Sequence, residues 1–166
     1  QQPLLVEKVR LKSDHNQKAT EMIFKDVVTL HPSGFFILGD VVSLGYSNKT
    51  WTAVDTYIRQ CRQDSIPVYA TLGNHEVMLN VKKGTANFRS RFPMYNPTGY
   101  TEIIDSVAVV LLNSNFGKMT TAGILAQDNW YNNIIKKFSG NLMLLSAPST
   151  HRRDCGGKPA CRFFLP

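Results

Sequence analysis

Two short polar segments contain the residue types that could bind metal ions and transfer protons. Asp40 follows a glycine at the end of one apolar run, and Asn74, His75 and Glu76 follow a glycine at the end of the next one. Carboxylate and amide oxygens suit hard divalent cations, and an imidazole can act as a general acid near neutral pH. Asp40 and Asn74 are therefore candidate metal ligands, and His75 is a candidate catalytic residue.

Each segment taken alone also has an ordinary structural explanation. A Gly-Asp pair after a strand is commonly a turn in which Asp caps the next helix, and an Asn-His pair is more often structural than catalytic. The ordered combination is more specific: FILGDVVSLG comes first, then a predicted helix, then PVYATLGNHE.

The pattern of apolar residues predicts the elements that would position these segments. Short apolar runs alternate with amphipathic stretches, which is typical of an α/β fold. Strands are predicted at 35–38, 67–72, 100–104, 107–112 and 142–145, and helices at 16–31, 48–64, 85–92 and 121–138. Because ligands bind at the carboxyl ends of parallel strands, a strand–helix–strand unit would place the two polar segments side by side.

Helical spacing also predicts which faces of three helices are buried. The predicted faces are Ala19, Met22, Ile23, Val27 and Leu30 in the first helix, Trp51, Val54, Ile58 and Cys61 in the second, and Ile124, Tyr131, Ile134, Ile135 and Phe138 in the last. The first strand, 35–38, is expected to be buried.

Composition narrows the class of protein. The chain has 166 residues, 43% hydrophobic and 19% charged, which fits one folded domain. Its net charge of +7 is scattered, so it indicates either a solvated basic face or a phosphate-seeking surface, without a nucleic-acid-binding module.

Cys155 and Cys161 could form a loop disulfide or stay free thiols. The sequence has no membrane-spanning run and no signal peptide; a mature exported chain would have lost the latter, so compartment and oligomeric state stay open.

The two polar segments resemble the second and third signature blocks of the calcineurin-like metallophosphoesterases, G-D-x-x and G-N-H-[DE]. The later run VAVVLLNSN, followed by a helix with Gln127, Trp130 and Tyr131, is similar to the purple-acid-phosphatase-like branch. The resemblance covers roughly residues 27–145 and implies an α/β/β/α sandwich.

The resemblance also implies roles for the candidate residues. Asp40 would bridge two cations, Asn74 would bind the second cation, and His75 would contact the scissile phosphate and protonate the leaving oxygen. The reaction would be hydrolysis of a phosphomonoester or phosphodiester by metal-bound hydroxide, with Mn, Fe or Zn as the divalent ions.

The sequence departs from the family pattern at its other ligand blocks. The family begins with D-x-H, whereas Asp14 and His15 are adjacent, and adjacent residues of an extended chain point to opposite sides. A family histidine is expected where Ala147 stands; His151 follows four residues later, beside two arginines, and is not assigned as a ligand. No G-H-x-H block is present. We therefore expect an incomplete site that holds metal ions weakly or not at all.

The C-terminal region is expected to form a separate part of the chain. Residues 1–147 are predicted to be a partial metallophosphoesterase domain, an incomplete sandwich, and residues 148–166 an irregular tail. Ala-Pro-Ser-Thr-His at 147–151 can be encoded so that a reading frame one base later gives His-His-Pro-Pro, so we expect a truncated or frameshifted C-terminus. A catalytically inactive remnant, or a basic α/β module that binds phosphate-bearing ligands, is the alternative function.

Overall fold

The computed structural model describes residues 16–139 and 143–146. The helices are α2 (Asn16–Leu30), α3 (Asn48–Gln63), α4 (Asn74–Val77), α5 (Val81–Arg91) and α6 (Thr121–Lys137), with a 3-10 turn η2 (Phe116–Lys118). The strands are β1 (Phe35–Leu38), β2 (Val68–Thr71), β3 (Tyr100–Ile104), β4 (Val107–Leu111) and β5 (Met143–Ser146). No helix in this described part is long and apolar enough to cross a membrane. Asp14, His15, His151 and the predicted tail lie outside these residues.

The strands form two small sheets. β1 and β2 pair in parallel, from Phe35 opposite Val68 to Leu38 opposite Thr71. β3 and β4 form an antiparallel hairpin, and β5 adds to β4 in parallel. Each parallel pair is joined by a crossover helix, α3 in one case and α6 in the other.

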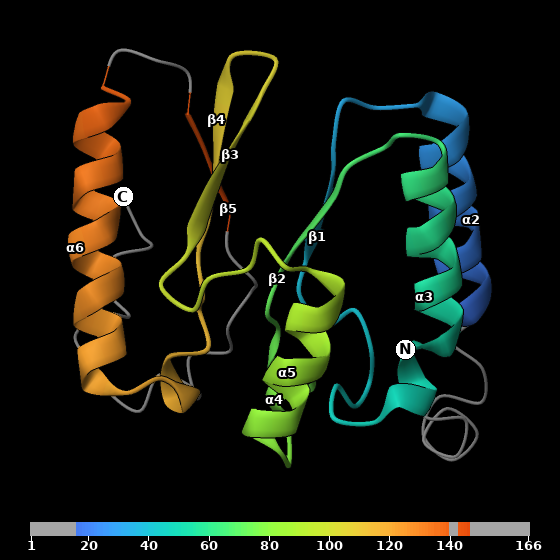
Figure 1. The fold of residues 1–166 in the computed structure, drawn as a ribbon, viewed down its shortest axis with the longest axis horizontal. Helices are drawn as coiled ribbons and strands as arrows, with labels where there is room; N and C mark the ends of the chain where they lie inside the picture. The colour runs from blue at the N-terminus through green and yellow to red at the C-terminus, as the bar shows by residue number, and fades with distance from the viewer. Residues whose placement is uncertain (1–15, 140–142, 147–166) are drawn as a thin grey trace.

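The elements lie in layers. Figure 1 shows α2 and α3 on one side of the β1–β2 sheet, the β3–β4–β5 sheet next to it, and α6 on the outer side. This order of helix, sheet, sheet and helix is consistent with an incomplete α/β/β/α metallophosphoesterase fold, so the predicted fold class is confirmed.

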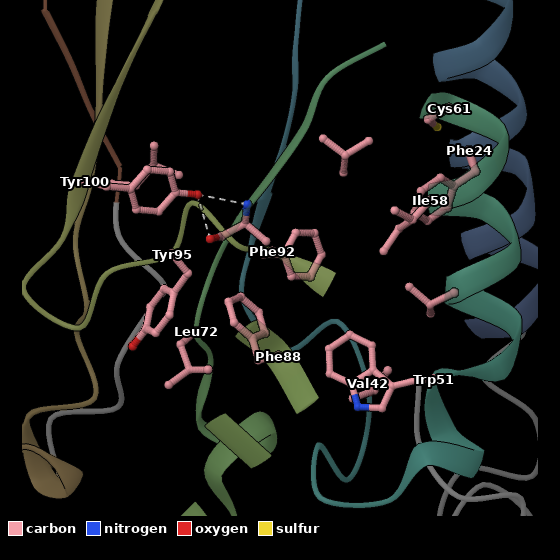
Figure 2. Packing of buried hydrophobic residues seen from close by; sticks show 14 of the residues in the cluster. Phe24, Val42, Trp51, Ile58, Cys61, Leu72, Phe88, Phe92, Tyr95 and Tyr100 are labelled. Carbon is pink, nitrogen blue, oxygen red and sulfur yellow. Dashed lines mark hydrogen bonds between the residues drawn. The ribbon is translucent and has the colours of Figure 1, made fainter. Parts of the chain in front are cut away.

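The main core lies between α3, α5 and β2. Trp51, Val54, Ile58 and Cys61 are at most 2% exposed, which confirms the predicted face of α3. Phe88 of α5 packs among these residues (Figure 2). Cys61 is a free thiol whose pKa is raised mainly by burial, and it acts as a small core residue.

Of the predicted face of α2, Val27 is half-buried and packs against the core, and the other four residues were predicted wrongly. Met22, Ile23 and Leu30 are 56%, 53% and 78% exposed, and Ala19 is exposed as well. Phe24 is buried instead, stacked on Tyr57 with ring centroids 5.1 Å apart. The inward side of α2 is thus formed by Phe24, Val27 and Val28, and Phe24 turns inward because its ring packs on those of Tyr57 and Phe35.

Two other predicted surfaces are less buried than expected. Leu38 of β1 is 49% exposed and the rest of β1 is half-buried, because β1 has one paired edge among the described strands. In α6 only Ile124 and Gln127 are buried, while Ile135 is 38% exposed. The Gln127 side chain is buried because its amide forms two hydrogen bonds with the Asn113 backbone after β4. The periodicity of apolar residues does not predict the burial of a glutamine.

The helix predicted at 85–92 begins earlier, at Val81. Asn80 caps it, since its side-chain oxygen accepts a hydrogen bond from the Lys83 nitrogen at 3.0 Å.

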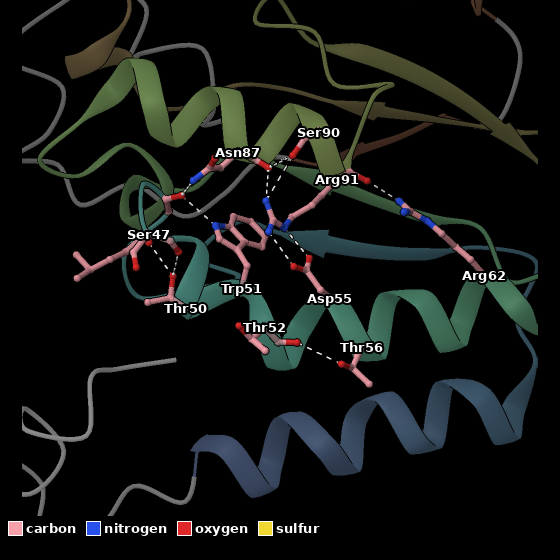
Figure 3. A network of polar contacts seen from close by, with 12 residues as sticks. Ser47, Thr50, Trp51, Thr52, Asp55, Thr56, Arg62, Asn87, Ser90 and Arg91 are labelled. Atoms are coloured by element: carbon pink, nitrogen blue, oxygen red, sulfur yellow. Dashed lines mark hydrogen bonds and ion pairs between the residues drawn. The ribbon is translucent and has the colours of Figure 1, made fainter.

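Near the other end of α5, Arg91 forms a two-bond ion pair with Asp55 of α3, at 2.5 and 2.8 Å (Figure 3). The Arg91 guanidinium also lies 4.5 Å from the centre of the Trp51 ring. These contacts join α5 to α3.

A tyrosine joins the two sheets. The Tyr100 hydroxyl donates to the Ala70 carbonyl at 2.8 Å and accepts from the Ala70 nitrogen at 3.1 Å (Figure 2). It thereby satisfies both backbone groups of Ala70 at the edge of β2 away from β1.

Candidate functional site

The candidate site lies at the edge where β1 and β2 end. Asp40 follows β1 with a φ of +51°, in the left-handed region that Asp tolerates better than most residues. Asn74 and His75 follow β2 in the single helical turn α4. Asp40 Oδ1 accepts a hydrogen bond from the His75 backbone nitrogen at 3.0 Å. The structure therefore brings the two predicted segments into direct contact.

Asp40 and Asn74 are exposed, whereas the His75 side chain is half-buried and held in place. His75 Nδ1 lies 3.0 Å from the Ser43 carbonyl oxygen. Because a carbonyl oxygen only accepts, Nδ1 carries a proton, and Nε2 is the nitrogen left to exchange one. In this orientation Nε2 accepts a proton when the ring is neutral and donates one when the ring is doubly protonated.

Glu76 is the functional-site residue to which sequence analysis assigned no role. It is 0% exposed, and its Oε2 accepts from the backbone nitrogens of Asp40 and Gly73, both at 2.9 Å. Its Oε1 accepts from the Val42 nitrogen at 3.1 Å. Burial raises the pKa of Glu76, as does the nearby Asp40 carboxylate, while the three backbone donors oppose this rise. The only sequence signal was its place at the end of the G-N-H-E block.

A third segment, after β4, packs against the end of β2. The buried Asn115 side chain donates to the Leu72 carbonyl oxygen. The Asn113 backbone is held in turn by the Gln127 side chain, which accepts from the Asn113 nitrogen and donates to the Asn113 carbonyl oxygen, both at 3.0 Å.

A cavity of about 230 Å³ lies beside this segment, with Leu72, Val77, Tyr95, Met119 and Lys118 among its lining residues.

The described residues include only some of the donors that the predicted metal site would need. Asp40 and Asn74 offer oxygen donors of the type that divalent cations prefer. Within 16–139 and 143–146, however, no three His, Cys, Asp or Glu side chains are grouped closely enough to hold a metal ion. The donor chemistry fits, but the number of donors in this part of the chain falls short of a two-metal centre.

Comparison with known families identifies the family of the chain. The profile of the calcineurin-like phosphoesterase family matches residues 13–165, which include both polar segments and all the described strands. The chain belongs to the calcineurin-like phosphoesterase family. Neither curated proteins nor solved structures gave a match to this phosphoesterase domain. Family membership therefore supports a phosphoesterase function in general.

Proposed function

We propose that this calcineurin-like phosphoesterase hydrolyses a phosphomonoester or phosphodiester with the help of divalent Mn, Fe or Zn ions. The observation that supports the proposal is the hydrogen bond from the His75 nitrogen to Asp40 Oδ1, because it gathers both polar segments at one sheet edge. A substrate phosphate held there would contact the candidate ligands and the candidate acid together.

In this proposal each residue has a separate task. Asp40 and Asn74 bind the cations, and His75 in its doubly protonated form contacts the phosphate and passes its Nε2 proton to the leaving oxygen, which leaves a neutral ring with its proton on Nδ1. The Ser43 carbonyl keeps the His75 ring in the required orientation. When bound, the cations neutralise phosphate charge and activate water. The remaining ligands would come from outside the described residues, and metal-dependent turnover would mean that residues such as Asp14, His15 or His151 complete the site.

We also propose the purple-acid-phosphatase-like branch of the family. The residues that carry this resemblance include Asn113 and Gln127, and the Gln127 side chain joins α6 to the Asn113 backbone after β4 through a pair of hydrogen bonds. The support is thus a specific contact between the two stretches that suggested the branch.

A catalytically inactive domain that binds phosphate-bearing ligands is the second candidate. It is favoured by the lack of a three-donor metal group within the described residues, together with the net charge of +7. Such a domain would bind inorganic polyphosphate with strong salt dependence and without turnover.

Metal-dependent turnover separates the two candidates. The purified chain is assayed with a chromogenic phosphomonoester and phosphodiester, with Mn, Fe or Zn added in turn. We expect His75→Ala to lower kcat by about 10²- to 10⁴-fold, because the leaving group then lacks its proton donor. Asp40→Asn should lower metal content as well as kcat, because one ligand loses its charge.

His31→Asn is the matched control, since His31 is an exposed histidine at the end of α2 with a left-handed φ of 48° that Asn tolerates. It should leave kcat unchanged. No turnover with any ion, together with metal content near zero and salt-sensitive polyphosphate binding, would contradict the hydrolase and support the second candidate.

A further inference from the structure

A buried carboxylate in the middle of the candidate site needs a reason. Glu76 is 0% exposed, and both of its carboxylate oxygens accept hydrogen bonds from backbone nitrogens. Burying a charge without partners is costly, so a buried carboxylate is found where several donors converge on it.

The donors come from two loops that are distant in sequence. The Asp40 and Val42 nitrogens belong to the loop after β1, and they precede Glu76 by 36 and 34 residues. The Gly73 nitrogen belongs to the turn after β2, and it shares Oε2 with the Asp40 nitrogen. One carboxylate group therefore connects the loop that carries one candidate ligand with the turn that carries the other.

The first loop contains a left-handed residue whose conformation such hydrogen bonds would stabilise. Asp40 has a φ of +51°, a region that L-residues other than Gly visit as isolated, locally stabilised positions. Its own nitrogen is bound by Glu76, and its Oδ1 accepts from the His75 nitrogen at 3.0 Å. The two oxygens of Glu76 accept three backbone hydrogen bonds, so Glu76 is well suited to hold this conformation.

We propose that Glu76 is a positioning residue, whose carboxylate holds the Asp40 loop and the Asn74–His75 turn in the one arrangement that binds cations and phosphate. The role as a positioning residue for catalysis rests on the proposed function. Glu76 itself touches neither substrate nor ions, because its oxygens are occupied by backbone donors and the side chain is buried.

Glu76→Gln is the most informative variant. The amide has the same shape and can still accept from the Asp40 and Gly73 nitrogens, but its NH₂ group faces the Val42 nitrogen, so that one hydrogen bond is replaced by a donor–donor contact. Glu76→Asp keeps the charge but shortens the side chain by a methylene, so it reaches one loop at a time. Tyr100→Phe is the matched control, because it removes buried hydrogen bonds to Ala70 of β2 and leaves both loops of the site intact.

The first measurement needs neither metal nor activity. Amide hydrogen exchange is followed by NMR in isotope-labelled wild-type protein and variants. In Glu76→Gln we expect exchange at Asp40 and Val42 to accelerate about tenfold or more, while the Ile58 amide in α3 keeps its protection. Unchanged exchange at Asp40 and Val42 would overturn the inference. If neither Glu76 variant folds, scalar couplings across the hydrogen bonds from the Asp40 and Val42 nitrogens to the Glu76 carboxyl carbon decide in the wild type, and their absence overturns it.

The second measurement compares Mn²⁺ affinity by calorimetry with kcat and KM for the chromogenic phosphoester. Glu76→Gln should weaken Mn²⁺ binding and lower kcat by about 10- to 100-fold, the usual effect of losing a residue that orients metal ligands. KM should change little. Tyr100→Phe should lower Tm while leaving the Mn²⁺ Kd and kcat of the folded protein at wild-type values.

The two proposals fail in different ways. A wild-type chain without Mn²⁺ binding or turnover contradicts the proposed function, and the exchange measurement still decides whether Glu76 holds the loops. A wild-type chain that turns over substrate, with equal Kd and kcat in Glu76→Gln, contradicts the positioning role. Equal losses in Glu76→Gln and Tyr100→Phe would also overturn it, because general destabilisation would then explain both.

Discussion

At the scale of single residues, the candidate site depends on how closely two backbone segments approach each other. Gly73 is buried at the point where the turn after β2 meets Asp40. A methyl group on Gly73 would overlap the Asp40 backbone nitrogen and Oδ1. These Asp40 atoms are already bound to Glu76 and to His75, so neither can move away freely.

Gly73→Ala is therefore expected to lower the free energy of unfolding by about 1–3 kcal/mol, the usual cost of overpacking. Gly123→Ala in the first turn of α6 is the matched control. Its methyl group would lie 3.2 Å from Thr120 Oγ1, the end of a side chain, and Ala favours a helix over Gly by up to about 1 kcal/mol. Urea unfolding of both variants, followed by circular dichroism, checks the prediction. Equal stability of Gly73→Ala and the wild type would show that the turn does not pack on Asp40 as described.

At the scale of elements, the β1–β2 sheet and the β3–β4–β5 sheet do not pair strand to strand among the described residues. The Tyr100 side chain connects them instead. Ala70 lies in β2, and its nitrogen and carbonyl oxygen both bond to the Tyr100 hydroxyl of β3. Backbone groups that are buried without a partner are costly, so this hydroxyl replaces what a neighbouring strand would supply.

Tyr100→Phe is expected to destabilise the protein by about 1–3 kcal/mol, because a buried nitrogen and a buried carbonyl oxygen lose their partner while the ring still fills its space. Thermal or urea unfolding measures this loss. Tyr46→Phe provides the comparison, since Tyr46 is half-buried in the loop before α3, and its effect should stay within about 0.5 kcal/mol. A Tyr100→Phe protein as stable as the wild type would mean that water can satisfy Ala70 instead.

At the scale of the whole molecule, packing of the two layers of strands and α5 encloses two phenol groups. Burial raises the pKa of Tyr95 from 10 to about 12, with the Arg89 charge acting in the opposite direction. Burial is also the main reason why the pKa of Tyr100 is raised, and its bond to the Ala70 backbone opposes the rise. Ionising either hydroxyl in place would put a charge into the core.

Stability is therefore expected to fall as pH rises from 10 to about 12. An unfolded tyrosine releases its proton near pH 10, whereas Tyr95 in the folded protein keeps it, so alkaline pH favours the unfolded chain. Urea unfolding at a series of alkaline pH values, with tyrosinate absorbance in the ultraviolet, measures both effects. Tyr95→Phe should flatten the pH dependence. Titration of all six tyrosines near pH 10 in the folded protein would contradict the prediction.

Features encoded by neighbouring residues could be predicted from the sequence. The face of α3 follows from Trp51, Val54, Ile58 and Cys61 at helical spacing, and β1 and β2 follow from short apolar runs that end in Gly-Asp and Gly-Asn. The same local signals identified Asp40, Asn74 and His75 as candidates and predicted that their segments meet, although their chemical roles stay predictions.

Other features were decided by the tertiary structure alone. Glu76 is separated from the Asp40 nitrogen by 36 residues, and Tyr100 from Ala70 by 30, so neither partner can be inferred from local spacing. In α2, two overlapping apolar faces compete, and Phe24 was selected because Tyr57 and Phe35 surround its ring. The physical reason is the same in each case: periodicity reports which side of an element is apolar, whereas burial of a particular group depends on the distant elements that pack against it.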